Sequence, residues 1–312
     1  MNSGIALVFP GQGAQAVGMG RDFYDREPLA RTMFDEAAGI LGYDLAQLCF
    51  DGPKEQLNLT EFTQPALLTV SAVALRLVER AGIRAAAVAG HSLGEYTALL
   101  AAGGLEFHDA LALVRKRGRY MQEAVDEGRG AVYAILGMER DAVVEGCREA
   151  SARGVVSPAN FNAPGQIVIA GEKAAVEEAV RLLKAKGCRK AIALSVSVPV
   201  HTVLMQPAAD RLAADLERVA ITDLHVPLVN NVDAKPVRRA SEVRPSLIRQ
   251  LPSSVLWEDS VRTLMTLGIH TLVEVGPGTV LSGLGKRIAP ELRLLNVQDS
   301  ASLTATVQAL AA

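Results

Sequence analysis

The sequence contains few aromatic residues, few cysteines and little net charge, and each shortage argues against a class of protein. Phe, Trp and Tyr make up 4% of the 312 residues, which favours closely packed helices over a β-sandwich. The three cysteines, Cys49, Cys147 and Cys188, are widely spaced and odd in number. This excludes a disulfide framework and a zinc-binding pattern. The formal net charge of −2 gives no indication of a nucleic-acid or membrane-surface partner.

Long apolar runs and targeting signals are also missing. No apolar run approaches the length of a membrane span, and the chain leads directly into the strand-like residues 5–9 without the basic region of a signal peptide. Apolar residues are 49% and charged residues 21% of the chain, so a sizeable core is expected and disorder is not. We therefore expect a soluble cytoplasmic protein without a metal site. Its length fits one large domain with an insertion, or two domains.

The segment Gly90-His91-Ser92-Leu93-Gly94-Glu95-Tyr96 contains a Gly-x-Ser-x-Gly motif centred on Ser92. Small apolar residues at 85–89 precede it as a short buried strand, and helix-forming residues at 97–102 follow it. A strand, a sharp turn and a helix are the context of a nucleophile elbow, in which a Cβ at either glycine would clash. The turn also places the serine at a helix N-terminus, where free N–H groups favour negative charge. Because the bare motif is common, an ordinary turn with a solvated serine is the alternative.

The residues around this motif indicate alternating strands and helices. The strand at 5–9 ends in a tight loop, Pro10-Gly11-Gln12-Gly13, with exposed backbone N–H groups. Its Gly-x-Gly lacks the third glycine of a dinucleotide-binding motif. Helices are expected at 28–41 and 65–81, with Pro65 in the first turn of the second. This alternation predicts an α/β fold, with a parallel sheet covered by helices on both faces.

The predicted helix at 108–124 carries a charge on its apolar face. At 100° per residue, Arg117 lies near the centre of a stripe made of apolar residues and Tyr120. An arginine on a core face is costly unless it is paired. Arg117 therefore meets either a buried carboxylate of the protein, as a structural ion pair, or a carboxylate of a ligand.

Residues 128–198 have a different pattern from the rest of the chain. Strands near 131–136, 155–170 and 191–198, with helices at 140–152 and 173–186, form a β-α-β-β-α-β unit of the ferredoxin-like type. We expect this unit to be a small subdomain inserted into a large one made of 1–127 and 199–312. The cleft between them would be a favoured ligand site.

His201 follows Pro199 and precedes a helix, where a loop side chain can face a cleft, although most histidines lie on the surface. An ordinary α/β-hydrolase orders its triad as Ser, acid, His. No acid stands at a strand end between Ser92 and His201, which argues against an ordinary esterase. Asp233 is the best-placed acid if a triad exists after all.

These features together make a family resemblance visible. The chain resembles the malonyl-CoA:acyl carrier protein transacylases of bacterial fatty-acid synthesis, and the matching residues span almost its whole length. They are Phe9-Pro10-Gly11-Gln12-Gly13, Thr63-Gln64-Pro65-Ala66, the segment 90–96, Arg117-Gly118 with Met121-Gln122, Asn160-Phe161-Asn162 with Pro164-Gly165-Gln166, Ser197-Val198-Pro199 with His201, Val229-Asn230-Asn231-Val232-Asp233, Gln250 with Trp257, and Glu274-Val275-Gly276-Pro277-Gly278.

The resemblance implies an α/β-hydrolase-like core and a ping-pong reaction. Ser92 would attack the thioester of malonyl-CoA with His201 as general base. The backbone carbonyl of Gln250, rather than a carboxylate, would orient the imidazole. The backbone N–H groups of Gln12 and Leu93 would form the oxyanion hole.

The resemblance also implies the substrates and their contacts. Arg117 would hold the malonyl carboxylate in a bidentate fork, and Asn160 and Gln166 would bind substrate. The malonyl group would pass to the phosphopantetheine thiol of acyl carrier protein, with no cofactor, no nucleic acid and no membrane involved. Two alternatives stay open: a serine thioester hydrolase, and a discrete loading acyltransferase of a polyketide or other malonate-using assembly.

Overall fold

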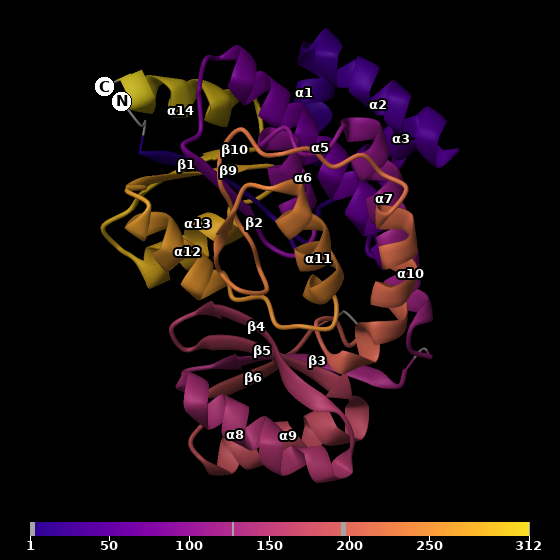
Figure 1. The fold of residues 1–312 in the computed structure, drawn as a ribbon, viewed down its shortest axis with the longest axis vertical. Helices are drawn as coiled ribbons and strands as arrows, with labels where there is room; N and C mark the ends of the chain where they lie inside the picture. Colours follow the sequence, from indigo (N-terminus) through magenta and orange to yellow (C-terminus); the bar gives the residue numbers. More distant parts are fainter. Residues whose placement is uncertain (1–3, 127, 195–197, 312) are drawn as a thin grey trace.

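The chain is organised around two separate sheets (Figure 1). The computed structural model describes residues 4–126, 128–194 and 198–311. The larger sheet contains β1 (Ile5–Phe9), β2 (Ala87–Gly90), β7 (Leu228–Val229), β8 (Pro236–Val237), β9 (Thr271–Val275) and β10 (Arg293–Val297). The smaller sheet contains β3 (Gly130–Leu136), β4 (Val156–Ala163), β5 (Gln166–Glu172) and β6 (Lys190–Ala193).

Helices pack against both sheets. Those before the small sheet are α1 (Arg21–Arg26), α2 (Pro28–Leu41), α3 (Leu45–Asp51), α4 (Lys54–Leu57), α5 (Thr60–Arg80), α6 (Gly94–Ala101) and α7 (Phe107–Glu123). The small sheet carries α8 (Arg140–Ala150) and α9 (Lys173–Ala185). The remaining helices are α10 (Gln206–Leu216), α11 (Ala240–Gln250), α12 (Trp257–Thr266), α13 (Val280–Ile288) and α14 (Ser300–Ala311). Short 3₁₀ turns occupy Ser151–Arg153 and Val203–Met205.

The larger sheet has the order β10-β9-β1-β2-β7-β8. Its strands are parallel except β8, which pairs antiparallel with β7. Successive side chains of β1 face opposite layers, as expected for a strand covered on both sides. Leu7 and Phe9 belong to the core beneath α5, α6 and α7, whereas Ala6 and Val8 belong to the core beneath α12 and α13. The predicted α/β class with a parallel sheet is thus confirmed.

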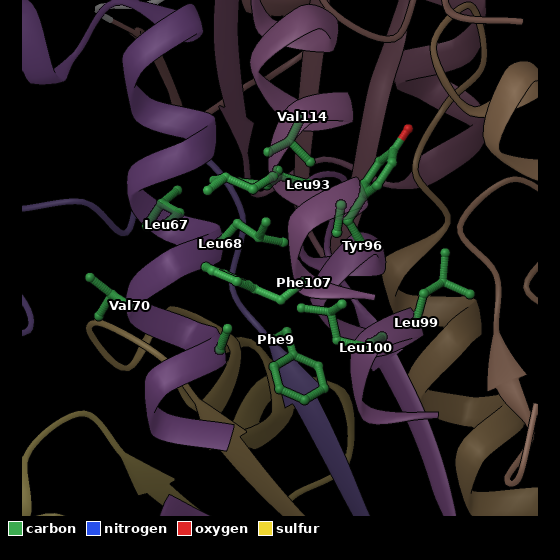
Figure 2. Close-up of a cluster of buried hydrophobic side chains, with 14 of the residues drawn as sticks. Phe9, Leu67, Leu68, Val70, Leu93, Tyr96, Leu99, Leu100, Phe107 and Val114 are labelled. Carbon is green, nitrogen blue, oxygen red and sulfur yellow. The ribbon is translucent and has the colours of Figure 1, made fainter. Parts of the chain in front are cut away.

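The first of these cores fixes the helix that begins at the motif serine. Figure 2 shows Leu67 and Leu68 of α5 beside Leu93, which precedes α6, with Tyr96 and Leu99 of α6 farther to the right in the same core. All five side chains are nearly fully buried. Dense apolar packing of this kind holds the turn before α6 in one position.

The smaller sheet has the order β4-β5-β3-β6, with every neighbouring pair antiparallel. With α8 after β3 and α9 after β5, this is the connectivity of a ferredoxin-like unit. In Figure 1, α8 and α9 lie on the side away from the larger sheet. Val255 joins the units, because it accepts from Phe161 N and donates to Ala159 O, both at 2.9 Å. The subdomain limits of 128 and 198 stay a prediction.

Two element boundaries differ from those expected. Helix α5 begins at Thr60, so Pro65 lies inside it and not in its first turn. The added turn is held by the Thr63 hydroxyl, which donates to Leu57 O at 2.6 Å, and Pro65 costs it only one backbone hydrogen bond. The strand expected at 191–198 ends at Ala193, and its residues 195–197 lie outside the described residues. Within the described ranges, no helix is long and apolar enough to cross a membrane.

Candidate active site

Ser92 occupies a strained turn at the end of β2. Its backbone φ is 51°, a left-handed conformation that is uncommon for a residue with a side chain. The flanking glycines are required, because a Cβ on Gly90 would lie 2.0 Å from Gly94 C and one on Gly94 would lie 2.0 Å from Phe9 O. Asn231, which follows β7, holds the turn by accepting from Ser92 N at 2.6 Å and donating to Gly90 O at 2.6 Å. The expected strand-turn-helix context of the motif is therefore present.

His201 lies beside the serine. Its Nε2 is 2.8 Å from Ser92 Oγ, and its Nδ1 is 3.0 Å from the backbone carbonyl oxygen of Gln250. A carbonyl can only accept, so Nδ1 carries the proton and the Nε2 of the neutral ring is left to accept from the serine hydroxyl. His201 is only 3% exposed, and its φ of 58° is also left-handed. The residue is therefore held in the orientation that a general base for Ser92 needs.

The surroundings of His201 keep its imidazole neutral. Burial, with the positive charge of Arg117 acting in the same direction, lowers the pKa of His201 to about 3. At neutral pH the ring can therefore accept a proton from Ser92. The charge on Arg117 opposes the imidazolium that would result.

Arg117, on α7, lies within hydrogen-bonding distance of the nucleophile. Its Nη2 donates to Ser92 Oγ at 3.0 Å and to Gln250 Oε1 at 2.9 Å, and its Nη1 donates to Gln64 Oε1 at 2.8 Å. The side chain is 1% exposed, and its Nε has no partner in the described part of the chain. None of these partners is a carboxylate, so the structural ion pair considered from the sequence is not formed by direct contact.

A buried acid lies behind Gln250. Glu95, in the first turn of α6, is 1% exposed. Its Oε2 accepts from Asn231 N and from Gln250 Nε2, both at 2.9 Å. Burial raises the pKa of Glu95 to about 7, against the opposing effect of these hydrogen bonds and of Arg117. Sequence reasoning did not assign a role to this residue, although an acid next to the otherwise apolar helix-forming run at 97–102 was a signal that could have been used.

Two residues with free backbone N–H groups line the cavity of the serine. Gln12 and Leu93 line the same cavity as Ser92 and His201. Within the described ranges, neither residue's backbone N–H is taken by another protein group. Leu93 precedes α6, whose dipole adds to the attraction of negative charge. These positions fit an oxyanion hole; that role stays a prediction.

Of the two residues predicted to bind substrate besides Arg117, one lines the cavity and the other does not. Asn160, 7% exposed, lines the cavity from the small sheet, together with the apolar Val132, Val168 and Leu194. Gln166 does not reach it: this residue begins β5, and its side-chain oxygen accepts from Arg287 at 2.6 Å. The expectation that it contacts substrate therefore finds no support in its position.

Asp233 is also separated from His201. Its carboxylate accepts from Arg249 at 2.7 and 3.0 Å, and this arginine lowers the pKa of Asp233. The Nδ1–H of the His201 imidazole donates to the backbone carbonyl of Gln250 instead. No group of three or more His, Cys, Asp or Glu side chains suited to a metal ion occurs among the described residues.

Comparisons with known proteins identify the family of this chain. The acyl transferase domain family matches residues 6–303. The malonyl CoA-acyl carrier protein transacylase of Escherichia coli K12 is 48% identical over 305 residues, covering 97% of this chain and 99% of that protein.

Solved structures give the same result. An acyl carrier protein S-malonyltransferase from Vibrio cholerae superposes with a TM-score of 0.94 at 48% identity, covering 97% of this chain and 99% of the other. A malonyl-transacylase in complex with a holo acyl carrier protein of a type II polyketide synthase superposes with a TM-score of 0.96 at 46% identity, covering 98% and 99%. The chain therefore belongs to the acyl transferase family and, within it, to the malonyl CoA-acyl carrier protein transacylases.

Proposed function

We propose that this protein transfers a malonyl group from malonyl-CoA to the phosphopantetheine thiol of acyl carrier protein, in fatty-acid biosynthesis, through an ester on Ser92. The relatives are named for this activity. The observation that carries the proposal is the triangle of Ser92, His201 and Arg117. The nucleophile contacts its base at 2.8 Å and the buried cation at 3.0 Å.

In the first half-reaction, Ser92 Oγ attacks the thioester carbon of malonyl-CoA and gives its proton to His201 Nε2. The Gln12 and Leu93 N–H groups stabilise the oxyanion of the tetrahedral intermediate. The C–S bond then breaks, and the proton passes from His201 to the sulfur of the leaving CoA. In the second half, the carrier thiol loses its proton to His201 and attacks the ester carbon. The C–O bond breaks and the proton returns to Ser92. The reaction written in this way requires no cofactor.

Arg117 provides the selectivity for a dicarboxylic acyl group. The guanidinium donates to Ser92 Oγ, so an acyl group esterified there lies next to it. A malonyl group brings a carboxylate to a buried cation that has no carboxylate in direct contact. Arginine suits a carboxylate because two of its N–H donors can bond the two carboxylate oxygens in parallel. An acetyl group would leave this buried cation with no carboxylate in direct contact.

The experiment is intact-mass measurement after mixing the protein with malonyl-CoA. We expect one malonyl adduct, lost in Ser92→Ala and transferred when holo acyl carrier protein is added. A covalent malonyl adduct on Ser92→Ala would refute the assignment of the nucleophile. Release of malonate at the same rate with and without carrier protein would identify a thioester hydrolase instead.

One observation favours a second biological setting for the same chemistry. The structural relative bound to a polyketide carrier protein is as similar to this chain as several of the others. Comparing kcat/KM for carrier proteins of the fatty-acid and polyketide types would separate the two settings. A higher value with the polyketide carrier would favour the loading role.

A cytoplasmic location is part of the proposal. The three cysteines are unpaired thiols, two of them buried, which fits a reducing compartment. Fractionation of the source cells, followed by detection of the protein, would test this.

A further inference from the structure

We propose that Glu95 is the counter-ion of Arg117 in the unloaded enzyme, and that Glu95 takes up a proton when a malonyl carboxylate binds Arg117. The inference rests on the proposed function and assigns a positioning and charge-balancing role to a residue that does not touch the acyl group. Three features support it: Gln250 connects the two buried charges, few other charges lie near them, and malonyl adds a second anion to the same buried site.

The two charged groups are connected through one amide. Gln250 Oε1 accepts from Arg117 Nη2, and Gln250 Nε2 donates to Glu95 Oε2, each at 2.9 Å. The amide thus turns its oxygen to the cation and its NH₂ to the anion, and its dipole is aligned between them. The same residue also directs its backbone carbonyl at His201 Nδ1. The charge state of Glu95 therefore bears on the orientation of both Arg117 and His201.

Few other charges reach this pair. Glu95 and Arg117 are each 1% exposed, so water does not screen them. Around Glu95, α6 contributes the Tyr96 ring, and Arg117 on α7 is the charge that acts on the carboxyl. The imidazole of His201 lies near Arg117 and His91. On α11, Arg249 is bound to Asp233, and Ser246 approaches Glu95 as a neutral donor at 3.4 Å. Arg117 is consequently the cation that balances Glu95.

Binding of malonyl changes this balance. The empty site holds one cation and one anion, whereas the loaded site would hold one cation and two anions, all removed from water. An additional buried charge of the same sign is expensive, and the acid that is easiest to protonate then becomes neutral. Glu95 is that acid, because the pKa of a malonyl carboxylate in contact with Arg117 is lowered and that of Glu95 is already raised. Acetyl brings no second anion and should leave Glu95 unchanged.

The experiment measures proton uptake on binding, with the chemical step removed. Malonyl-CoA is titrated into Ser92→Ala by calorimetry at pH 7.5 in buffers of different ionisation enthalpy, which gives the number of protons bound per site. We expect uptake of more than about half a proton with malonyl-CoA, because Glu95 is mostly ionised in the empty site at this pH. Acetyl-CoA is the matched ligand, and it should give uptake close to zero.

The double variant Ser92→Ala/Glu95→Gln identifies the group. Gln keeps the size of the side chain and one acceptor oxygen, and it cannot titrate. Uptake with malonyl-CoA should vanish in the double variant. If uptake persists there, the proton goes to His201 or His91 and the inference is wrong. If heats in Ser92→Ala are the same in every buffer, there is no linked proton and the inference is also wrong.

Two further results separate the inference from the proposed function. Saturable malonyl-CoA binding without proton uptake would overturn the role of Glu95 alone, whereas no malonyl-CoA binding would overturn both. If the double variant does not fold, infrared difference spectra of Ser92→Ala, with and without ¹³C-labelled glutamate, replace it. A protonated carboxyl band that appears with malonyl-CoA and shifts with the label supports the proposal, and its absence refutes it.

Discussion

At the scale of single residues, the two proposed reacting groups share an unusual backbone conformation. Ser92 and His201 have φ values of 51° and 58°, and Ala234 is the one other non-glycine residue with positive φ in the described part of the chain. Such a conformation costs on the order of 1–3 kcal/mol per residue and persists only where surrounding contacts enforce it. Asn231 holds the backbone of Ser92, and the Gln250 carbonyl holds the ring of His201. The strain is therefore located at the two residues that must meet.

Arg117→Ala should change the acyl preference and not only the rate. The variant loses the attraction for the malonyl carboxylate, and it also loses the penalty of burying an acetyl group beside a guanidinium that has no carboxylate in direct contact. We expect the ratio of kcat/KM for malonyl-CoA over acetyl-CoA to fall by at least about 10²-fold, the scale for breaking a buried charge pair. Arg117→Lys should recover part of it, because an ammonium cannot make two parallel contacts. An equal loss with both substrates would mean that Arg117 is structural.

Asp233→Asn should cost little turnover. The carboxylate of Asp233 is bound to Arg249, and the imidazole Nδ1 that a triad acid would contact already donates to Gln250 O. We expect kcat to stay within about tenfold of the unmodified enzyme, against the roughly 10⁴-fold loss seen when a triad carboxylate is removed. Steady-state kinetics distinguish a histidine oriented by the Gln250 carbonyl from a Ser-His-Asp triad. A melting curve of the variant detects any loss of stability caused by the substitution.

At the scale of elements, the elbow depends on how closely β2, α6 and the loop after β1 approach one another. Gly94→Ala would place a Cβ 2.0 Å from Phe9 O, a backbone atom that cannot move alone. We expect a large fall in the unfolding midpoint and in kcat. Gly283→Ala is the matched control, because this glycine is exposed on α13 and a Cβ there meets nothing within 4 Å. It should gain about 0.5–1 kcal/mol in the free energy of unfolding. Equal stability of the two variants would contradict this account of the elbow.

The elements that sequence predicted best are those specified by local pattern. The bounds of α2, at Pro28–Leu41, agree with the prediction, and the Gly-x-Ser-x-Gly motif indicated the turn around Ser92. The residues that were missed act across long distances in the chain. Glu95 meets Gln250, and Asn231 meets Ser92, and no periodicity encodes such contacts. Gln166 was singled out by its motif, and its side chain accepts from Arg287; its contact with substrate stays a prediction.

At the scale of the whole molecule, two buried groups give the stability of the fold opposite dependences on pH. Burial raises the pKa of Glu95 from 4.5 to about 7. The folded state then holds a proton that the unfolded chain releases, so this stability is complete below pH 4.5 and is lost as pH rises to about 7. Burial lowers the pKa of His201 from 6.5 to about 3. Its contribution is complete above pH 6.5 and is lost as pH falls towards 3.

Between pH 4.5 and 6.5 the two dependences oppose each other, and each has a slope of up to about 1.4 kcal/mol per pH unit. Replacing one of the two titrating residues should reveal the pH dependence that the other contributes. The free energy of unfolding of His201→Gln should fall relative to the unmodified protein as pH rises through this range. That of Glu95→Gln should rise over the same range and, because Glu95 titrates to about 7, continue to do so until that pH. Denaturant unfolding at half-unit steps from pH 4.5 to 8 measures both. If the two variants show the same slope, these buried groups do not control the pH dependence, and the charge balance between Glu95 and Arg117 must be weaker than their burial implies.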